Sequence, residues 1–191
     1  KTGKKIKKKK YITLKKNNPN LQLERIIGVN GEVVKYLLDL SIINNSPRNY
    51  RTKPIIKGEL FPNFIAKTIN KRIIELSRQR GKIVILRFEL EANSFRFKKQ
   101  EIKQIDNLIN KINNKNEKVK AIIFFASNEL DIKQGFDLQN SNFEIISNGY
   151  NFQEKFSITR FPTTIVIYKN GKLIDYYNYM DEINLTHLIN E

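Results

Sequence analysis

Two uninterrupted apolar runs, separated by a helix-like segment, constrain the fold of this chain most. The run KIVILRF at residues 82–88 and the run VKAIIFFA at residues 119–126 are typical of strands buried on both faces. Between them, residues 100–112 carry apolar side chains at helical spacing. These are Ile102, Ile105, Leu108, Ile109 and Ile112. The middle of the chain therefore predicts a strand, a helix and a second strand.

Shorter segments around this centre have strand-like or helix-like patterns of their own. Strands are expected at residues 72–76, 143–146, 163–168 and 172–179. Short helices are expected at residues 151–158 and 181–191. This order of elements predicts an α/β domain with a central mixed β-sheet flanked by helices.

The residues before this domain have a different pattern. Residues 21–43 contain two apolar-rich runs around Asn30-Gly31, a dipeptide suited to a tight hairpin turn. They predict an N-terminal β-hairpin extension, and the polar residues 44–54 predict a connection. We therefore expect three parts. They are a lysine-rich tail (1–16), a hairpin extension with its linker (17–57) and the α/β domain (58–191).

The net charge of +16 resides mostly in the tail, where residues 1–16 hold nine lysines and no acidic residue. Residues 1–10 are expected to be disordered when free, because their like charges repel. The candidate anion-binding residues are Lys4, Lys5, Lys7, Lys8, Lys9 and Lys10. Lysine is attracted to the phosphates of nucleic acid or of an acidic lipid surface but gives no bidentate base readout. A purely solubilising tail, or one shaped by coding bias, is the alternative.

The chain has no cysteine and a single histidine, His187, which we expect at the surface or at a helix end. Disulfides, thiol catalysis and zinc sites built from Cys and His are therefore excluded. The sequence also lacks a glycine-rich phosphate loop, a metal-ligand cluster and a Ser-centred nucleophile motif. We expect no catalytic residue, cofactor, metal or small-molecule substrate. No segment approaches the ~20 apolar residues of a membrane span. Because the chain begins at Lys1, an upstream anchoring segment is expected.

Two separate stretches resemble one family. Residues 58–89 run from Gly58 through Pro-x-Phe and Gly-Lys to a buried strand, and residues 156–177 contain Phe-Pro-Thr, a strand, Asn-Gly-Lys and another strand. Both resemble the thioredoxin-like superfamily, in its extracytoplasmic TlpA-like and AhpC/TSA-like branch. The resemblance implies that Pro162 takes the place of the family's cis-proline. It also puts the family's Trp-Cys-x-x-Cys loop at residues 89–97.

In that loop, Asn93 and Arg96 stand near the two cysteine positions, so this chain resembles a degenerate member. Thiol–disulfide exchange needs a thiolate, which neither side chain provides. The resemblance leaves a groove that extended polypeptides occupy in redox members of the family. Its two sides would be formed by Ser94, Phe95 and Arg96 and by Arg160, Phe161 and Pro162. The two phenylalanines either anchor a protein partner or fill the space of the lost motif.

Glu89 and Glu91 share a face if the strand continues, with Arg96 nearby in sequence. General acid–base chemistry is one interpretation, and an ion pair at a helix start is favoured over it. The sequence thus predicts a redox-inactive binding or scaffold subunit of a larger protein assembly in the periplasm or cell envelope, with the cytoplasm as the alternative location. Non-specific binding of an anionic surface through the tail is the alternative function.

Overall fold

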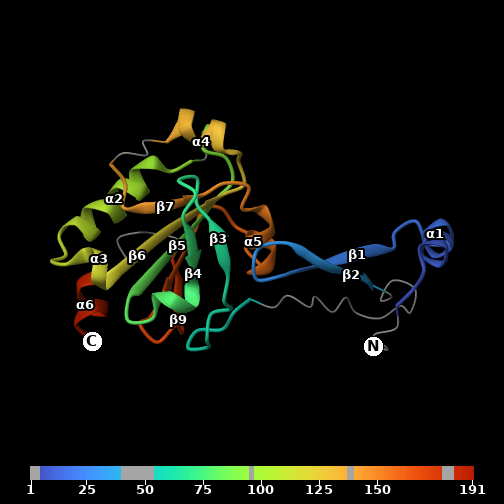
Figure 1. Ribbon diagram of the computed structural model, residues 1–191, viewed down its shortest axis with the longest axis horizontal. Helices are drawn as coiled ribbons and strands as arrows, with labels where there is room; N and C mark the ends of the chain where they lie inside the picture. Colours follow the sequence, from blue (N-terminus) through green and yellow to red (C-terminus); the bar gives the residue numbers. More distant parts are fainter. Residues whose placement is uncertain (1–4, 40–53, 95–96, 137–139, 178–182) are drawn as a thin grey trace. The chain divides into compact units, whose positions relative to one another are not determined.

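The computed structural model describes residues 5–39, 54–94, 97–136, 140–177 and 183–191 (Figure 1). The chain divides into two compact units. One comprises Lys1–Ile26 and Val33–Arg51, and the other comprises Ile27–Glu32 and Thr52–Glu191. No helix in the described part of the chain is long and apolar enough to cross a bilayer.

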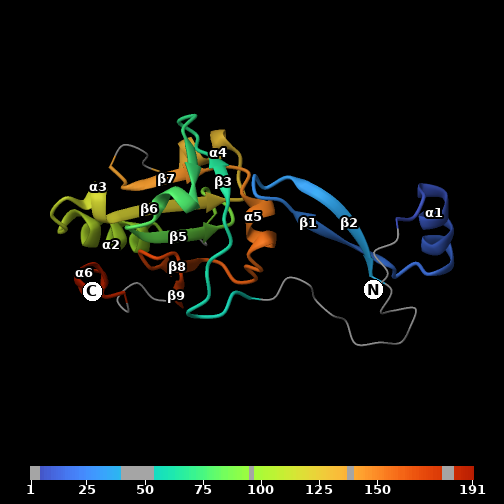
Figure 2. The same ribbon diagram turned by 60° about the horizontal axis from the view of Figure 1, so that its bottom comes forward.

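A five-stranded mixed sheet forms the centre of the second unit, with the strand order β7-β6-β5-β8-β9. Its strands are β5 (Ile83–Glu89), β6 (Val119–Phe125), β7 (Phe143–Ile146), β8 (Thr163–Ile167) and β9 (Leu173–Tyr177). β5, β6 and β7 are parallel, whereas β8 is antiparallel to both β5 and β9. Figure 2 shows the strands in this order from top to bottom. Every residue of β5 is buried, as its continuous apolar run predicted.

Two hydrophobic clusters cover the two faces of the sheet because alternate residues of a strand point to opposite sides. Ile83 and Ile85 of β5 pack with the apolar stripe of helix α2 (Lys99–Asn110), and Val84 and Leu86 pack with an aromatic cluster on the other face. The aromatic cluster contains Phe61, Phe64, Phe88, Phe124, Phe152 and Phe156.

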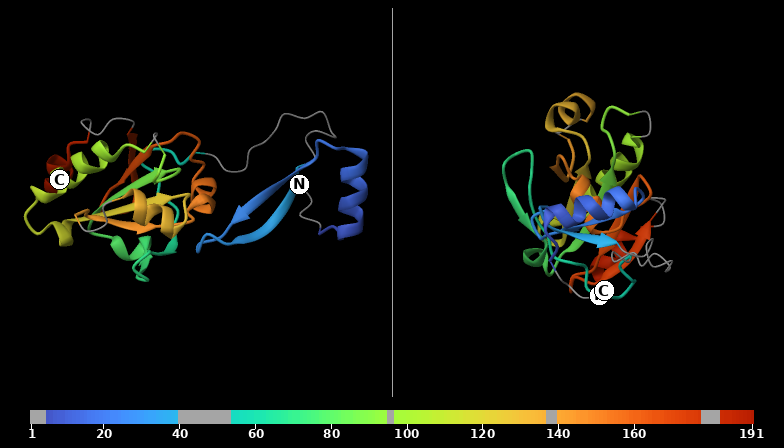
Figure 3. Two further views of the ribbon diagram at one scale, coloured as in Figure 1. Left: turned by 90° about the horizontal axis from the view of Figure 1, so that it is seen from above. Right: turned by 90° about the vertical axis from the view of Figure 1, so that its right-hand side faces the viewer.

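Helices and a small hairpin supply the residues that cover these faces. The helices of this unit are α2 (Lys99–Asn110), α3 (Lys115–Lys118), α4 (Glu129–Gly135), α5 (Tyr150–Lys155) and α6 (Leu185–Asn190). β3 (Ile65–Lys67), β4 (Ile73–Glu75) and the 3-10 turn η1 (Leu76–Gln79) complete it. In the left view of Figure 3, α2 and α6 lie on one side of the sheet and the β3–β4 hairpin on the other. The predicted α/β domain with a central mixed sheet flanked by helices is confirmed.

The first unit contains helix α1 (Lys8–Asn17) and most of the hairpin formed by β1 (Gln22–Ile27) and β2 (Val33–Asp39). The predicted hairpin is confirmed in its described part, and residues 40–43 lie outside the described residues. The prediction that residues 1–10 are disordered is wrong for Lys8, Lys9 and Lys10, which begin α1. Lysine has a helix propensity close to that of leucine, and Tyr11 and Leu14 give this helix a half-buried side.

The turn of the hairpin belongs to the second unit. It is a three-residue loop, closed by a 2.8 Å bond from the Gly28 amide to the Glu32 carbonyl, with only Gly31 at positive φ (78°). The Ile65 amide donates to the carbonyl of Val29 at 2.9 Å. Asn151 and Lys155 of α5 donate to the Gly31 and Gly28 carbonyls at 2.8 and 2.7 Å. The turn is therefore fixed to β3 and α5.

Candidate functional site

The pairing of β5 with β8 brings two loops together at one end of the sheet. In this antiparallel register Phe88 lies opposite Thr163, so the next residue of β5, Glu89, lies beside Pro162. The Phe161–Pro162 peptide bond is cis, as the resemblance implied. The loop after β5 and the loop before β8 thus face each other.

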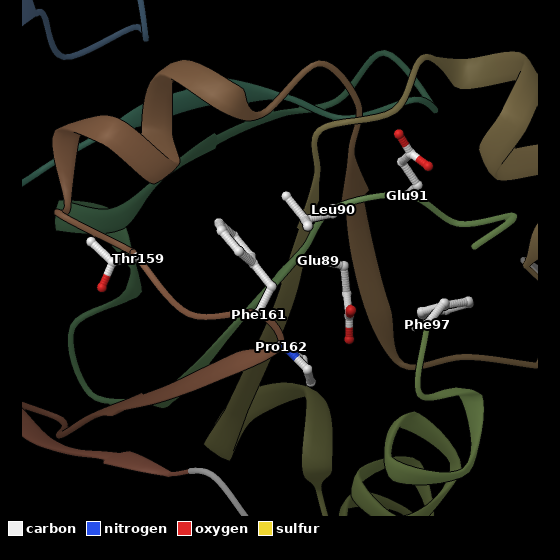
Figure 4. A pocket seen from close by; sticks show the side chains of 7 residues that line it. All are labelled: Glu89, Leu90, Glu91, Phe97, Thr159, Phe161 and Pro162. Carbon is white, nitrogen blue, oxygen red and sulfur yellow. The ribbon is translucent and has the colours of Figure 1, made fainter. Parts of the chain in front are cut away.

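A pocket of about 180 Å³ opens between these loops. Its lining combines apolar side chains with two carboxylates and a hydroxyl. The residues are Glu89, Leu90, Glu91, Phe97, Thr159, Phe161 and Pro162. In Figure 4 the Glu89 carboxylate lies between Pro162 on one side and the Phe97 ring on the other.

A buried network of charged groups lies behind the pocket. Arg87 and Glu89, at 0% and 2% exposure, point to the same face of β5. The Arg87 guanidinium donates from Nε to Oε1 of Glu89 at 2.8 Å and from Nη1 to Oγ1 of Thr164 at 2.8 Å. It also donates from Nη2 to Oε2 of Glu101 on α2 at 2.6 Å. A buried charge is tolerated only when it is paired and hydrogen-bonded, and this network provides both for Arg87.

Burial raises the pKa of the Glu89 carboxyl above its usual range, because the charged form loses its hydration. Arg87 opposes this shift through its charge and its hydrogen bond, and the negative charge of Glu101 adds to it. The carboxyl at the floor of the pocket therefore binds a proton more strongly than an exposed glutamate does.

Glu89 and Glu91 do not share a strand face, because β5 ends at Glu89, although both line the pocket. Glu89 is buried and Glu91 is exposed at the pocket. The ion pair that Glu89 forms in the described structure is with Arg87, within the strand. Arg96, the partner expected from sequence, lies outside the described residues.

The structure brings only some of the predicted groove residues to the pocket. Phe161 and Pro162 line it, and Phe161 also packs against the aromatic cluster. Ser94 is half-buried and Arg160 is exposed, and neither lines the pocket. Phe95 lies outside the described residues. Leu90 and Phe97 lie in the loop at 89–97 that the resemblance indicated but were not singled out from the sequence, and Thr159 was not expected at the site.

Asn93, which the resemblance puts near a cysteine position of the family, lies at a neighbouring polar depression. This depression is lined by Glu91, Asn93, Ala126, Ser127, Asn128, Asp131 and Asn148. In the part of the chain that the structure describes, no three His, Asp or Glu side chains gather closely enough to hold a metal ion. His187 is exposed on α6, where Nδ1 lies 3.2 Å from Oε1 of Glu191, so its predicted surface position is confirmed.

Sequence comparison finds no matching family and no matching curated protein. Structure comparison finds many similar chains. A chain assigned as the thiol:disulfide interchange protein DsbE of Chlorobium tepidum has 17% identity and a TM-score of 0.59, over 71% of this chain and 96% of that one. The thioredoxin domain of a thiol-disulfide oxidoreductase from Bacteroides vulgatus has 18% identity and a TM-score of 0.56, over 70% and 96%. A thiol:disulfide interchange protein from Bacteroides sp. has 17% identity and a TM-score of 0.57, over 72% and 92%.

The second unit therefore has a thioredoxin-like fold, which confirms the fold implied by the resemblance. Unlike a thiol:disulfide oxidoreductase, this chain contains no cysteine. Because disulfide exchange proceeds through a thiolate and a mixed disulfide, these 191 residues cannot carry it out. Asn93, which the resemblance puts near one of the family's cysteine positions, is exposed.

Proposed function

We propose that this chain is a redox-inactive binding subunit whose thioredoxin-like domain holds a polypeptide partner at the Pro162 loop, as part of a larger assembly. The observation that carries the proposal is the pocket of about 180 Å³ at this loop, in a thioredoxin-like chain without a thiol. A site for holding a partner remains after the chemistry that would modify it is lost.

The size and lining of the pocket support a protein partner. Sites for drug-sized molecules are roughly 300–1,000 Å³, so this pocket suits a single side chain better than a free ligand of that size. Its walls include Phe97, Phe161 and Leu90, and buried aromatic anchors dominate the energetics of many protein interfaces. An inserted side chain would exclude water from these rings.

Affinity purification of the full chain from its native cells, with nuclease treatment and mass spectrometry, tests this proposal. A stoichiometric, nuclease-resistant protein partner is expected, and Phe161→Ala should abolish its capture. Ile73→Ala is the matched control, because Ile73 is an apolar residue of β4 with 73% exposure that does not line the pocket. Recovery of no protein partner, or equal capture by Phe161→Ala, contradicts the proposal.

We place this assembly in the cell envelope or periplasm, because residues 58–89 and 156–177 resemble an extracytoplasmic branch of the superfamily. Cell fractionation of the native protein tests the location. Recovery with the cytoplasmic fraction contradicts the location and leaves the binding function to its own test.

The alternative function is non-specific binding of anions through the tail. Lys5, Lys7, Lys8, Lys9 and Lys10 are all exposed, which favours contact with phosphates, and Lys4 lies outside the described residues. Binding to RNA or to acidic lipid vesicles should then fall steeply with added salt and disappear when residues 1–16 are deleted. Binding that is unaffected by the deletion contradicts this alternative.

A further inference from the structure

We infer that the pocket at the Pro162 loop takes a lysine side chain of the partner, whose ammonium group pairs with Oε2 of Glu89. This inference rests on the proposed function, since it specifies the chemical group that a bound polypeptide inserts. Three observations support it: the balance of charge behind the pocket, the oxygen of Glu89 at its floor that is unpaired among the described residues, and the apolar side chains that form its walls.

Among the residues that the structure describes, the charge behind the pocket is unbalanced. Two carboxylates, Glu89 and Glu101, share the single guanidinium of Arg87. The exposed carboxylate of Glu91 adds a further negative charge at the pocket, and Lys98, which is exposed, offsets it from the start of α2. Glu89 is the buried carboxylate of this set, and a buried negative charge is costly unless it is paired, so a cation inserted beside it lowers that cost.

One oxygen of Glu89 is available for that cation. Oε1 accepts the Nε–H of Arg87, whereas Oε2 has no hydrogen-bond partner among the described residues. Figure 4 shows the carboxylate directed into the space between Pro162 and Phe97. A donor that enters the pocket therefore meets an unused acceptor at its floor.

The open acceptor suits lysine better than arginine. A guanidinium binds a carboxylate best with two parallel hydrogen bonds, which needs both oxygens, and one of them is already engaged by Arg87. An ammonium group acts as a compact point charge and needs one oxygen. The side chains of Phe97 and Phe161 line the pocket and provide apolar walls for the lysine stem.

The test is an NMR titration of the full-length protein with two blocked peptides, acetyl-Ala-Ala-Lys-Ala-Ala-amide and the same peptide with norleucine in place of lysine. The two probes differ only in the ammonium group. We expect the lysine peptide to bind about tenfold more tightly at neutral pH and low salt, with chemical-shift changes at Leu90, Thr159 and Phe161. Equal affinity for the two peptides, or shift changes confined to other residues, overturns the inference.

Two variants locate the effect. Glu89→Gln removes the charge and keeps the shape, so the preference for lysine should be lost. Glu91→Gln, at the exposed side of the pocket, should change the preference about twofold or less, because charges in water are screened. If Glu89→Gln does not fold, the lysine inference is tested by the affinities of the two peptides for the wild-type protein alone.

Failure of the lysine inference can be distinguished from failure of the proposed binding function. If Phe161→Ala loses the native partner but the wild-type protein does not prefer the lysine peptide, the binding function stands and the lysine inference fails. If the lysine peptide is preferred but no native partner is captured, the inference stands and the scaffold function fails.

Discussion

Nε of Arg87 lies 2.8 Å from Oε1 of Glu89, two residues further along the same strand, and both side chains are almost completely buried. This pair lies in the central strand of the sheet and its carboxylate forms part of the pocket floor. The stability of the domain and the chemistry of the candidate site therefore depend on the same two side chains.

Removing one partner of this pair should be more harmful than removing both. Arg87→Met leaves Glu89 buried without its cation, and we expect a loss of about 3–5 kcal/mol in the free energy of unfolding. The double variant Arg87→Met/Glu89→Leu should recover about 2 kcal/mol of that loss, because no buried charge remains on the strand. Urea unfolding monitored by circular dichroism measures both. A double variant less stable than Arg87→Met would contradict this account of the pair.

The raised pKa of Glu89 gives a pH dependence of known sign. Between the ordinary glutamate pKa of 4.5 and the higher pKa of folded Glu89, the folded state binds more protons than the unfolded state. The contribution of Glu89 to stability is thus fully present below pH 4.5 and is lost as the pH rises through the folded pKa. Asp175 has the opposite sign, because its hydrogen bond to Lys57 lowers its pKa.

The difference in the free energy of unfolding between the wild type and Glu89→Gln isolates the contribution of Glu89. The wild type should lose stability relative to the variant as the pH rises above about 4.5. At lower pH the difference in their free energies of unfolding should be constant. Urea unfolding across this range measures the difference. A constant difference at all pH values would show that the pKa of Glu89 is the same in the folded and unfolded states.

Gly31→Ala should weaken the attachment of the hairpin turn to β3 and α5. Gly31 has φ of 78°, and a Cβ built there lies 2.8 Å from the buried ring of Phe152. Gly81→Ala is the matched control, with φ of 88° and no atom within 4 Å of the built Cβ. Both changes have a backbone cost of about 1–2 kcal/mol, and crowding of Phe152 should add about 1–3 kcal/mol for Gly31 alone.

Hydrogen exchange of the Ile65 amide reads the local effect of Gly31→Ala, because this amide donates to the carbonyl of Val29 in the turn. In Gly31→Ala, the protection of this amide from exchange should fall by more than the change in the global free energy of unfolding explains. In Gly81→Ala, its protection should change only as much as the global free energy of unfolding does. Equal behaviour of the two variants would mean that Phe152 yields to the added methyl group.

Lys71→Gly should stabilise the protein. Lys71 closes the β3–β4 turn with φ of 64°, a conformation in which glycine has no Cβ penalty. The gain should be about 0.5–1 kcal/mol, because the exposed contact of Lys71 with Glu129 at 3.4 Å contributes little. Lys67→Gly, at an exposed position of β3 with extended backbone, should instead lose about 0.5–1 kcal/mol. Thermal unfolding of both variants checks the signs.

The predictable part of the fold was local in origin. The continuous apolar run of β5 and the helical stripe of α2 were predicted because strand and helix periods depend on neighbouring residues. Helix α4 was not predicted, although Asn128 caps it through a 3.0 Å bond to the Asp131 amide. It has seven residues, and its buried apolar side chain is Ile132, too little periodicity to stand out in the sequence.

The candidate site was predicted in part. Pro162 and Phe161 follow from a motif that can be read along the chain, and the pocket forms beside them. Phe97 and Thr159 join them only after folding, because Phe97 lies at the end of the loop after β5, ahead of α2, and Thr159 precedes β8. No spacing in the sequence relates these two residues.

The sequence by itself determined the α/β order of elements and the loss of thiol chemistry, since periodicity and the absence of cysteine are properties of the linear chain. Only the tertiary structure decided that Arg87 is buried with its charge intact. Its partners Glu101 and Thr164 lie 14 and 77 residues away, on α2 and β8. A charged residue in an apolar strand is stable there because three elements bring hydrogen-bond acceptors to one guanidinium, and that meeting exists only in the folded domain.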